Sequence, residues 1–232
     1  MTNDMETLDP SLADQRAAML RDIEVEVAAT RYEVGKSRLS EAVMDAVARV
    51  PREYFLPDYN RYLAFDNGAV QIGYGQTISQ PYVVALMTDL LEVRPESVIL
   101  EVGTGSGYQA AVLAALARQV YSLEIIEPLA SAAAGRLASL GYANAAVYHA
   151  DGYHGWPEHA PYDGIMVTAA AVQVPPPLLE QLKPGARLVM PVGAPHDVQT
   201  LRVYTKHEDG SSTARNILAV AFVPLTRLAC KL

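Results

Sequence analysis

The stretch Ser97-Val98-Ile99-Leu100-Glu101-Val102-Gly103-Thr104-Gly105-Ser106-Gly107 joins an apolar run to a glycine turn. Residues 97–102 have the length and composition of a buried strand, and the alternate glycines after them permit a tight turn. Residues 108–117, rich in Ala and Leu, are predicted to form the helix that follows. A strand, a glycine turn and a helix in this order are typical of the first unit of a nucleotide-binding α/β fold.

The alternation of strands and helices continues after this unit. Further strands are predicted over 120–125, 145–149, 162–168, 187–191, 201–206 and 218–224, with helices over 128–140 and 178–182. Such alternation gives a mostly parallel sheet with helices on both faces. We therefore expect an α/β, Rossmann-like fold.

The N-terminal part of the chain predicts helices rather than strands. Asp9 and Pro10 are the predicted cap and first residue of a helix, and apolar side chains recur at helical spacing over the following residues 12–29. A second helix is expected between Ser37 and Pro51. We expect residues 1–50 to form a helical cap on a main domain of residues 51–232. A chain of 232 residues suits one compact domain made of these two parts.

Composition and charge exclude several classes of protein. The net charge is −8 and the sequence pI is about 5.1, without the basic patch of a nucleic-acid binder. The single cysteine, Cys230, excludes an internal disulfide, and the five histidines lack metal-site spacing. No apolar run approaches the roughly 18 residues of a membrane span, and the polar N-terminus lacks a signal-peptide pattern. We expect a cytoplasmic protein without metal, membrane or nucleic-acid partners.

Two acidic residues follow the glycine turn at positions where a cofactor would meet them. Glu124 ends the next predicted strand, about 20 residues after the turn, where a carboxylate can bind both ribose hydroxyls. Asp151 follows the third strand, level with an adenine ring. Because the carboxyl ends of parallel strands meet at one edge of the sheet, the sequence predicts an adenosine-type cofactor there.

The spacing of the glycines favours one cofactor over another. A dinucleotide fingerprint has its third glycine one residue later than Gly107, and a pyrophosphate would be repelled by Glu101 at the end of the strand. A carboxylate at Glu101 could instead accept bonds from the ammonium group of a methionine moiety. S-adenosylmethionine is therefore favoured over a nicotinamide cofactor.

A second glycine-containing segment precedes this unit. Gly73-Tyr74-Gly75-Gln76-Thr77-Ile78-Ser79-Gln80-Pro81 combines two glycines with polar side chains directly before a helix that Pro81 opens. We expect a loop whose backbone approaches a ligand closely.

Several segments together resemble the protein-L-isoaspartate O-methyltransferases. They are Gly75–Pro81, Leu100–Gln109, Gly155–Asp163, Val167–Ala170 and Phe222–Leu225, and the likeness runs from about Val50 to Leu225. The glycine turn is shared by many methyltransferases, whereas the Gly-Gln-Thr-Ile-Ser segment is far more specific.

The resemblance implies a Rossmann-like S-adenosylmethionine-dependent methyltransferase fold with an antiparallel strand near its end. It implies methyl transfer to the free carboxylate of L-isoaspartyl or D-aspartyl residues in damaged proteins and peptides, and repair through a succinimide. Ser79 matches the active-site serine of the family, and Thr77 belongs to the same loop. The matching cofactor contacts are Gly103, Gly105, Glu124, Ile125, Asp151, Gly152 and Thr226.

The chain also departs from the pattern of the family. Many members have two prolines in the segment that corresponds to Ala69-Val70-Gln71-Ile72-Gly73, and many have Arg where this chain has Ala221. These differences concern the binding of substrate more than the chemistry. A substrate carboxylate with an ordinary pKa near ~4 is ionised at neutral pH, so no general base is needed.

Other functions remain compatible with the sequence. They are a methyltransferase of the same fold that acts on a carboxylate of one dedicated peptide, a cofactor-binding module without activity, and a dehydrogenase. We expect a general repair enzyme, because the chain ends soon after the last predicted strand and relatives specialised for one peptide often carry an extra C-terminal domain. We also expect it to work as a monomer.

Overall fold

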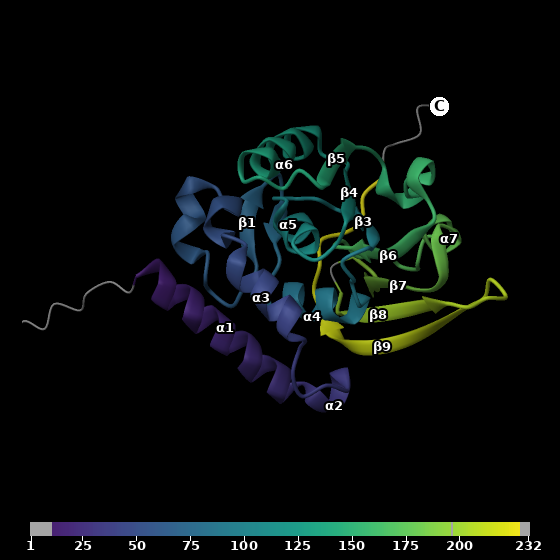
Figure 1. Ribbon diagram of the computed structural model, residues 1–232, viewed down its shortest axis with the longest axis horizontal. Coiled ribbons are helices and arrows are strands. Elements are labelled where there is room, and N and C mark those ends of the chain that lie inside the picture. Colours follow the sequence, from purple (N-terminus) through teal and green to yellow (C-terminus); the bar gives the residue numbers. More distant parts are fainter. Residues whose placement is uncertain (1–10, 196, 228–232) are drawn as a thin grey trace, which may run out of the picture.

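The computed structural model describes residues 11–195 and 197–227, which are built around one large sheet (Figure 1). Its seven strands lie in the order β5-β4-β3-β6-β7-β8-β9. They are β3 (Val98–Val102), β4 (Gln119–Glu124), β5 (Ala145–His149), β6 (Tyr162–Val167), β7 (Leu182–Val192), β8 (Gln199–Lys206) and β9 (Ser212–Val220). Neighbouring strands are parallel except in the pairs β7–β8 and β8–β9, so β8 runs against the others. The mostly parallel sheet with an antiparallel strand near its end is confirmed.

Strand order places a topological switch point at β3. From β3 the chain moves outward to β4 and β5, and then returns to lay β6 against the other side of β3. Open α/β sheets bind ligands at the carboxyl ends of the strands where the direction reverses. A ligand-binding site is therefore expected at the edge formed by the ends of β3, β4 and β6.

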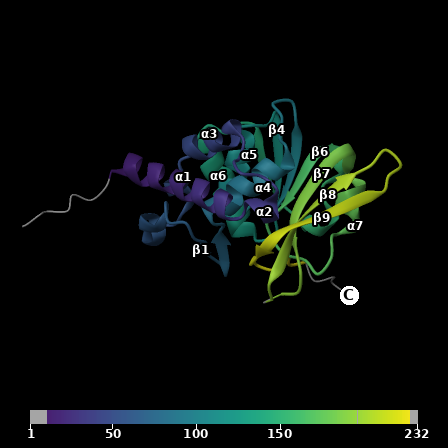
Figure 2. The same ribbon diagram turned by 90° about the horizontal axis from the view of Figure 1, so that it is seen from below.

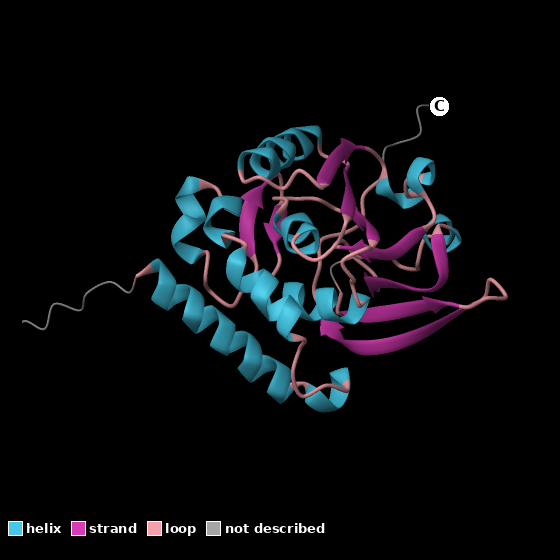
Figure 3. Cartoon of the chain, viewed as in Figure 1, coloured by secondary structure: helices cyan, strands magenta, loops and turns pink. Residues whose placement is uncertain are grey.

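Helices cover both faces of the sheet unequally. They are α1 (Leu12–Ala29), α2 (Arg31–Val34), α3 (Glu41–Arg49), α4 (Pro81–Leu91), α5 (Tyr108–Ala114), α6 (Glu127–Ser139) and α7 (Pro176–Glu180). Figures 2 and 3 show α1, α3 and α4 together on one side of the strands. The short 3₁₀ helices are η1 (Arg52–Phe55), η2 (Asp58–Leu63), η3 (Gly152–His154) and η4 (Pro157–His159).

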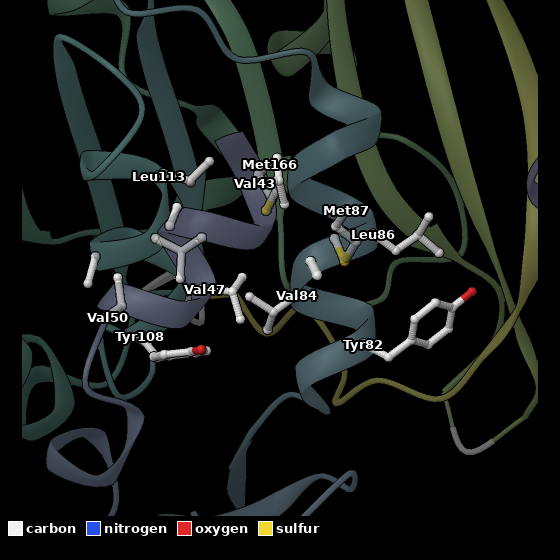
Figure 4. Packing of buried hydrophobic residues seen from close by; sticks show 14 of the residues in the cluster. Val43, Val47, Val50, Tyr82, Val84, Leu86, Met87, Tyr108, Leu113 and Met166 are labelled. Carbon is white, nitrogen blue, oxygen red and sulfur yellow. The ribbon is translucent and has the colours of Figure 1, made fainter. Parts of the chain in front are cut away.

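Alternate residues of each strand enter two separate hydrophobic cores. In β3, Ile99 joins the core under α1, α3, α4 and α5, whereas Leu100 and Val102 join the smaller core beneath α7. This alternation follows from the two-residue period of a strand. Figure 4 shows Val47 of α3 and Val84 of α4 pointing toward one another in the larger core.

Helix α4 lies in the middle of the larger core. Pro81 opens the helix at a position where its missing N–H costs nothing. Ten of its residues are buried because α1 and α3 pack on the side away from the sheet. The ends of α4 and of the segment before it are thereby fixed relative to β3.

The helices before residue 50 share the core of the rest of the chain. Met19, Ile23 and Val27 of α1 belong to the same buried cluster as α4 and β3. The helix predicted over 12–29 is confirmed, but its N-cap is Ser11 rather than the predicted Asp9, because the Ser11 side chain accepts a hydrogen bond from the Asp14 N–H. The division into parts at residue 50 stays a prediction.

Three elements differ most from the boundaries that the sequence predicts. The second helix begins at Glu41 rather than near Ser37, because Ser40 accepts a hydrogen bond from the Val43 N–H and caps it. Strand β7 begins at Leu182 through an irregular register, ahead of the predicted Arg187. Strand β9 starts earlier and ends at Val220, because residues 222–225 leave the sheet to cross the end of β6.

The segment predicted as a loop before α4 is a β-hairpin. Strands β1 (Val70–Gly73) and β2 (Gln76–Ile78) pair antiparallel. The two linking residues, Tyr74 and Gly75, both have positive φ angles of 54° and 71°, as a type I′ turn requires. The glycine serves this turn, and the hairpin positions the residues that follow it.

Candidate active site

Three adjacent pockets open at the edge formed by the ends of β3, β4 and β6. We call them the glycine-loop pocket, the junction pocket and the outer pocket. Thr77 of β2 and Thr168, the residue after β6, line all three. These two threonines therefore mark the point at which the pockets meet.

The glycine-loop pocket collects most of the predicted cofactor residues. Its wall contains Gln76, Thr77, Val102, Gly103, Gly105, Leu123, Glu124, Ile125, Ile126, Gly152, Thr168, Ala169, Val223, Pro224, Leu225 and Thr226. The sequence thus correctly grouped Thr77, Gly103, Gly105, Glu124, Ile125, Gly152 and Thr226, which come from separate segments of the chain. Their roles toward a cofactor stay predictions.

Gly103 cannot be replaced by a larger residue without a clash. Its φ angle is +97°, and a Cβ there would lie 2.4 Å from Oγ1 of Thr168. The Thr168 hydroxyl donates a hydrogen bond of 2.5 Å to the Gly103 carbonyl. The backbone of the loop is therefore locked against the end of β6.

Glu124 is held by the backbone on two sides. Its Oε2 accepts a hydrogen bond of 2.7 Å from the Gly105 N–H, and its Oε1 accepts one of 3.0 Å from the Ile126 N–H. A carboxylate offers about four acceptor positions. The side chain is thus fixed by two bonds and keeps lone pairs for the hydroxyls of a ribose.

Glu101 lies next to the pockets but lines none of them. It is fully buried, Ser122 Oγ donates to its Oε2, and its Oε1 has no hydrogen-bond partner in the part of the chain that the structure describes. Burial, with the charge of Glu124 as a smaller cause, raises the pKa of Glu101 to about 8 despite the bond from Ser122. The structure therefore does not bring Glu101 to the cofactor residues, and its contact with an ammonium group stays a prediction.

Asp151 is likewise beside the pocket rather than in its wall. Its Oδ1 accepts a hydrogen bond from the Tyr153 N–H and caps η3, while its Oδ2 lies 3.7 Å from Nε of Arg227. The following residue, Gly152, does line the pocket, and a Cβ there would lie 2.3 Å from Val102 Cγ1. Asp151 therefore acts on the pocket indirectly, because it caps the helix that begins at Gly152.

A segment after β9 separates the glycine-loop pocket from the outer pocket. We call residues 222–226 the strap. The Ala170 N–H donates to the Val223 carbonyl at 2.8 Å, and the Leu225 N–H donates to the Ala170 carbonyl at 2.7 Å. These bonds place Thr226 in the glycine-loop pocket and Phe222 in the outer pocket.

Ser79 and Thr77 present hydroxyl groups that the chain itself does not use. Neither hydroxyl makes a hydrogen bond to any residue that the structure describes, although both side chains are half-buried. Ser79 could have been a helix cap, but the N-cap of α4 is Gln80. Ser79 lines the junction and outer pockets, so its hydroxyl is available to a ligand there.

Arg52 binds the main chain of Ser79 but lines none of the three pockets. This side chain of η1 is fully buried, and it donates hydrogen bonds of 2.8 Å to the carbonyls of Ser79 and Ala64. Its guanidinium carbon lies 4.7 Å from the ring centre of Tyr108, which also lines the junction pocket. No carboxylate pairs with Arg52 among the described residues, so a positive charge lies behind the serine without an acidic partner.

The outer pocket is the largest of the three, with a volume of about 490 Å³. Its wall contains Glu26, Thr30, Ala69, Thr77, Ser79, Gln80, Tyr82, Val83, Thr168, Val198, Leu218, Ala219, Val220, Ala221, Phe222 and Val223. The residues come mainly from α1, α4, β9 and the strap. An extended peptide could lie here with one side chain directed past Ser79 toward the junction.

Sequence reasoning assigned no role to Thr168, although it lies where all three pockets meet. The position could have been found, because Thr168 follows the strand that the parallel topology lays next to β3. Glu26 and Arg52 carried no comparable signal, since both are distant from the site in the sequence.

Comparison with known proteins agrees with this geometry. The family model described as protein-L-isoaspartate (D-aspartate) O-methyltransferase matches residues 31–229. The chain belongs to this family. A curated relative from Syntrophobacter fumaroxidans, protein-L-isoaspartate O-methyltransferase 2, is 59% identical over 91% of this chain and 85% of its own length. Protein-L-isoaspartate O-methyltransferase 1 of Cupriavidus necator is 54% identical over 94% and 84% of the two chains.

Solved structures of the family share the fold. A protein-L-isoaspartate O-methyltransferase superposes with a TM-score of 0.76 at 26% identity, over 90% of this chain and 65% of that longer one. A putative member from Plasmodium falciparum, solved with S-adenosyl-L-homocysteine, has a TM-score of 0.72 at 22% identity over 91% and 98% of the chains. The Rossmann-like methyltransferase fold is confirmed.

Neither a membrane-spanning helix nor a metal-binding cluster occurs among the described residues. None of the helices within 11–195 and 197–227 is long and apolar enough to cross a bilayer. In the same ranges, His, Cys, Asp and Glu side chains form no group of three that could hold a metal ion. Cys230 and His196 lie outside the described residues.

Proposed function

We propose that this chain transfers a methyl group from S-adenosylmethionine to the free carboxylate of L-isoaspartyl and D-aspartyl residues in damaged proteins and peptides. The observation that carries the proposal is the pair of unused hydroxyls, Thr77 and Ser79, at the meeting point of the glycine-loop pocket and the outer pocket. Membership of the family supports the same reaction.

The glycine-loop pocket fits an adenosyl cofactor. Gly103 and Gly105 keep the backbone open to close approach, and Glu124 retains acceptor positions for two ribose hydroxyls. Ile125, Gly152 and Thr226 complete the wall around the base and ribose. When bound, S-adenosylmethionine supplies an electrophilic methyl group on a positively charged sulfur.

The outer and junction pockets fit a carboxylate that needs orientation rather than activation. The hydroxyl of Ser79 can donate to one oxygen, and Ser79 lies just before the N-terminal end of α4, whose helix dipole favours an anion. The cation of Arg52 behind the serine adds to this attraction. Good orientation can remove about 7–11 kcal/mol of a barrier, so these residues act by holding the nucleophile in line.

The ester that results is more reactive than the carboxylate. Attack of the neighbouring main-chain nitrogen on the ester carbonyl expels methanol and forms a succinimide. Hydrolysis of the succinimide returns part of the material as ordinary aspartyl linkage. The enzyme has only to place the methyl group, because the later steps proceed without it.

Transfer of labelled methyl to a matched pair of peptides tests the proposal. One peptide contains an isoaspartyl residue, and its twin has the same sequence with a normal aspartyl linkage. We expect rapid labelling of the first and background labelling of the second. Equal labelling of both peptides, or of neither, contradicts the proposed substrate.

The remaining sequence predictions complete this proposal. We infer that the partners are isoaspartyl-containing polypeptides rather than nucleic acids, and that the chain works as a monomer in the cytoplasm. The outer pocket, which is lined largely by apolar side chains together with one acid, supports a peptide partner. Light scattering of the purified chain tests the monomer, and fractionation of cells that express it tests the location.

A further inference from the structure

One wall of the outer pocket comes from a helix that the family model does not match. Glu26 and Thr30 belong to or follow α1 and line the pocket, whereas the family match begins at residue 31. Among the described side chains that line it, Glu26 is the one carboxylate, and none is Lys or Arg. This helix therefore adds a negative charge to a pocket that is otherwise neutral.

The carboxylate of Glu26 is fixed without being neutralised. Its Oε1 accepts hydrogen bonds of 2.7 Å from Nδ2 of Asn67 and 3.0 Å from Nε2 of Gln80. Both donors are uncharged amides. No Lys, Arg or His within the described part of the chain lies at ion-pair distance from Glu26, and its Oε2 makes no hydrogen bond there.

Glu26 is also close to the residues that hold the substrate. Gln80, which binds Glu26, is the neighbour of Ser79 in the chain. Burial raises the pKa of Tyr82 in the same wall, and the charge of Glu26 is a smaller cause in the same direction. Arg52 lies outside the wall of the outer pocket but binds the Ser79 carbonyl, so the nearest positive charge is on the serine side and the negative charge of Glu26 is on the α1 side.

We propose that Glu26 makes the enzyme select isoaspartyl sites that have Lys or Arg nearby in the peptide and disfavour sites flanked by Asp or Glu. The inference rests on the proposed function. A peptide that places its isoaspartyl carboxylate against Ser79 and a cation toward α1 matches the charges on both sides of the pocket. An acidic neighbour instead meets a fixed carboxylate of the same sign.

Three isoaspartyl peptides that differ only in the flanking residues test this selection. The flanks are Lys, Gln or Glu on both sides, and kcat/KM is measured for each by labelled methyl transfer. For the unmodified chain we expect the Lys peptide to exceed the Glu peptide by about threefold to tenfold, the range of a partly exposed ion pair. Added salt should reduce the ratio, because it screens the charges.

Variants of α1 assign the effect to one side chain. Glu26→Gln keeps an acceptor for the two amides, and it should bring the Lys-to-Glu ratio close to one. Glu26→Lys should reverse the order of the peptides. Glu24→Lys is the matched control, since Glu24 is exposed on the same helix, outside the pocket, and undergoes the same change of charge. It should keep the order found for the unmodified chain.

The outcomes separate this inference from the function on which it rests. Suppose that the unmodified chain methylates the Gln peptide, and that the ratio of kcat/KM between the Lys and Glu peptides is the same for the unmodified chain and for Glu26→Gln. The inference that Glu26 selects the substrate is then wrong. If the unmodified chain does not methylate the Gln peptide at all, the proposed function fails. Activity of each variant on the Gln peptide shows that its fold is intact.

Discussion

The two sides of the active site are built from different parts of the polypeptide. The glycine-loop pocket is formed largely by backbone: Gly103 has a conformation that only glycine tolerates, and Glu124 is bound by two main-chain N–H groups. The outer pocket is formed by side chains such as Ser79 and Glu26, which come from segments more than fifty residues apart. The cofactor side is thus fixed by the fold, whereas the substrate side can change residue by residue.

This difference predicts that the two sides tolerate substitution to different degrees. A substitution in the glycine loop must respect a φ angle and a contact with Thr168. A substitution at Ala221 or Glu26 alters the size or charge of a wall and leaves the backbone in place. Specificity for the substrate can therefore evolve without loss of cofactor binding.

The largest effect is expected from a bulky residue in the glycine loop. Gly103→Val places a side chain into Oγ1 of Thr168 and forces a positive φ angle on a β-branched residue. We expect the affinity for S-adenosylhomocysteine, measured by calorimetry, to fall by about a hundredfold or more. Gly135→Ala is the control, because a Cβ there meets nothing within 4 Å; it should bind normally. Normal binding by Gly103→Val would show that the backbone is not the determinant.

A second large effect concerns stability and pH beneath the glycine loop. Burial raises the pKa of Glu101 to about 8, whereas the unfolded chain has the ordinary value near 4.5. At a pH between these two pKa values, the carboxyl group of Glu101 is protonated in the folded protein and ionised in the unfolded chain. The contribution of Glu101 to the free energy of unfolding is therefore full below pH 4.5 and is lost as the pH rises to about 8.

Replacement of Glu101 by glutamine, which is neutral and nearly the same shape, removes this loss of stability at high pH. We expect Glu101→Gln to match the unmodified chain near pH 4.5 and to exceed its free energy of unfolding by about 4 kcal/mol at pH 8. Urea unfolding at a series of pH values measures the difference. A difference that does not change with pH would show that Glu101 is ionised in the folded protein.

On the substrate side, Ser79→Ala should separate turnover from cofactor binding. Loss of a hydrogen bond to a charged acceptor costs about 1.5–3 kcal/mol, so kcat/KM for an isoaspartyl peptide should fall roughly tenfold to a hundredfold. The affinity for S-adenosylhomocysteine should stay unchanged, in contrast to Gly103→Val. Unchanged kinetics would exclude a hydrogen-bonding role for Ser79.

The smallest effect is expected at the turn between β1 and β2. Tyr74 has a φ angle of 54°, which is unfavourable for most side chains, and it is exposed. Asn tolerates this conformation and precedes Gly75, as in the preferred type I′ sequence. Tyr74→Asn should raise the free energy of unfolding by about 1 kcal/mol in urea titrations. A decrease would mean that the ring of Tyr74 stabilises the hairpin more than its backbone strains it.

Sequence patterns predicted the helices and strands whose apolar residues recur with a clear period and whose ends are marked by a change of residue type. The strand at 145–149 has the predicted bounds, and the first helix ends where predicted but begins at Leu12 rather than at Pro10. The hairpin of β1 and β2 was missed because its strands have four and three residues, too few to show an alternation. The start of β9 was missed because its first residues are polar and exposed at the edge of the sheet.

The grouping of the expected cofactor residues in one pocket could be predicted because these residues follow strands that the topology places side by side. Gly103, Glu124 and Gly152 lie at or after the ends of β3, β4 and β5, and the rule for parallel sheets brings them to one edge. The residues around the substrate obey no such rule. Glu26 reaches the site only because α1 crosses α4, and this contact depends on packing between distant segments.

The strap has a further consequence for the order of events in a catalytic cycle. Val223 lines both the glycine-loop pocket and the outer pocket, so a ligand in either pocket would meet the same short piece of chain. Any shift of this shared partition by one ligand alters the affinity for the other, and thermodynamic linkage makes the influence equal in both directions. If product release at one side moved the strap, the affinity of the other pocket would change, and the two hydrogen bonds of Ala170 would resist such a movement.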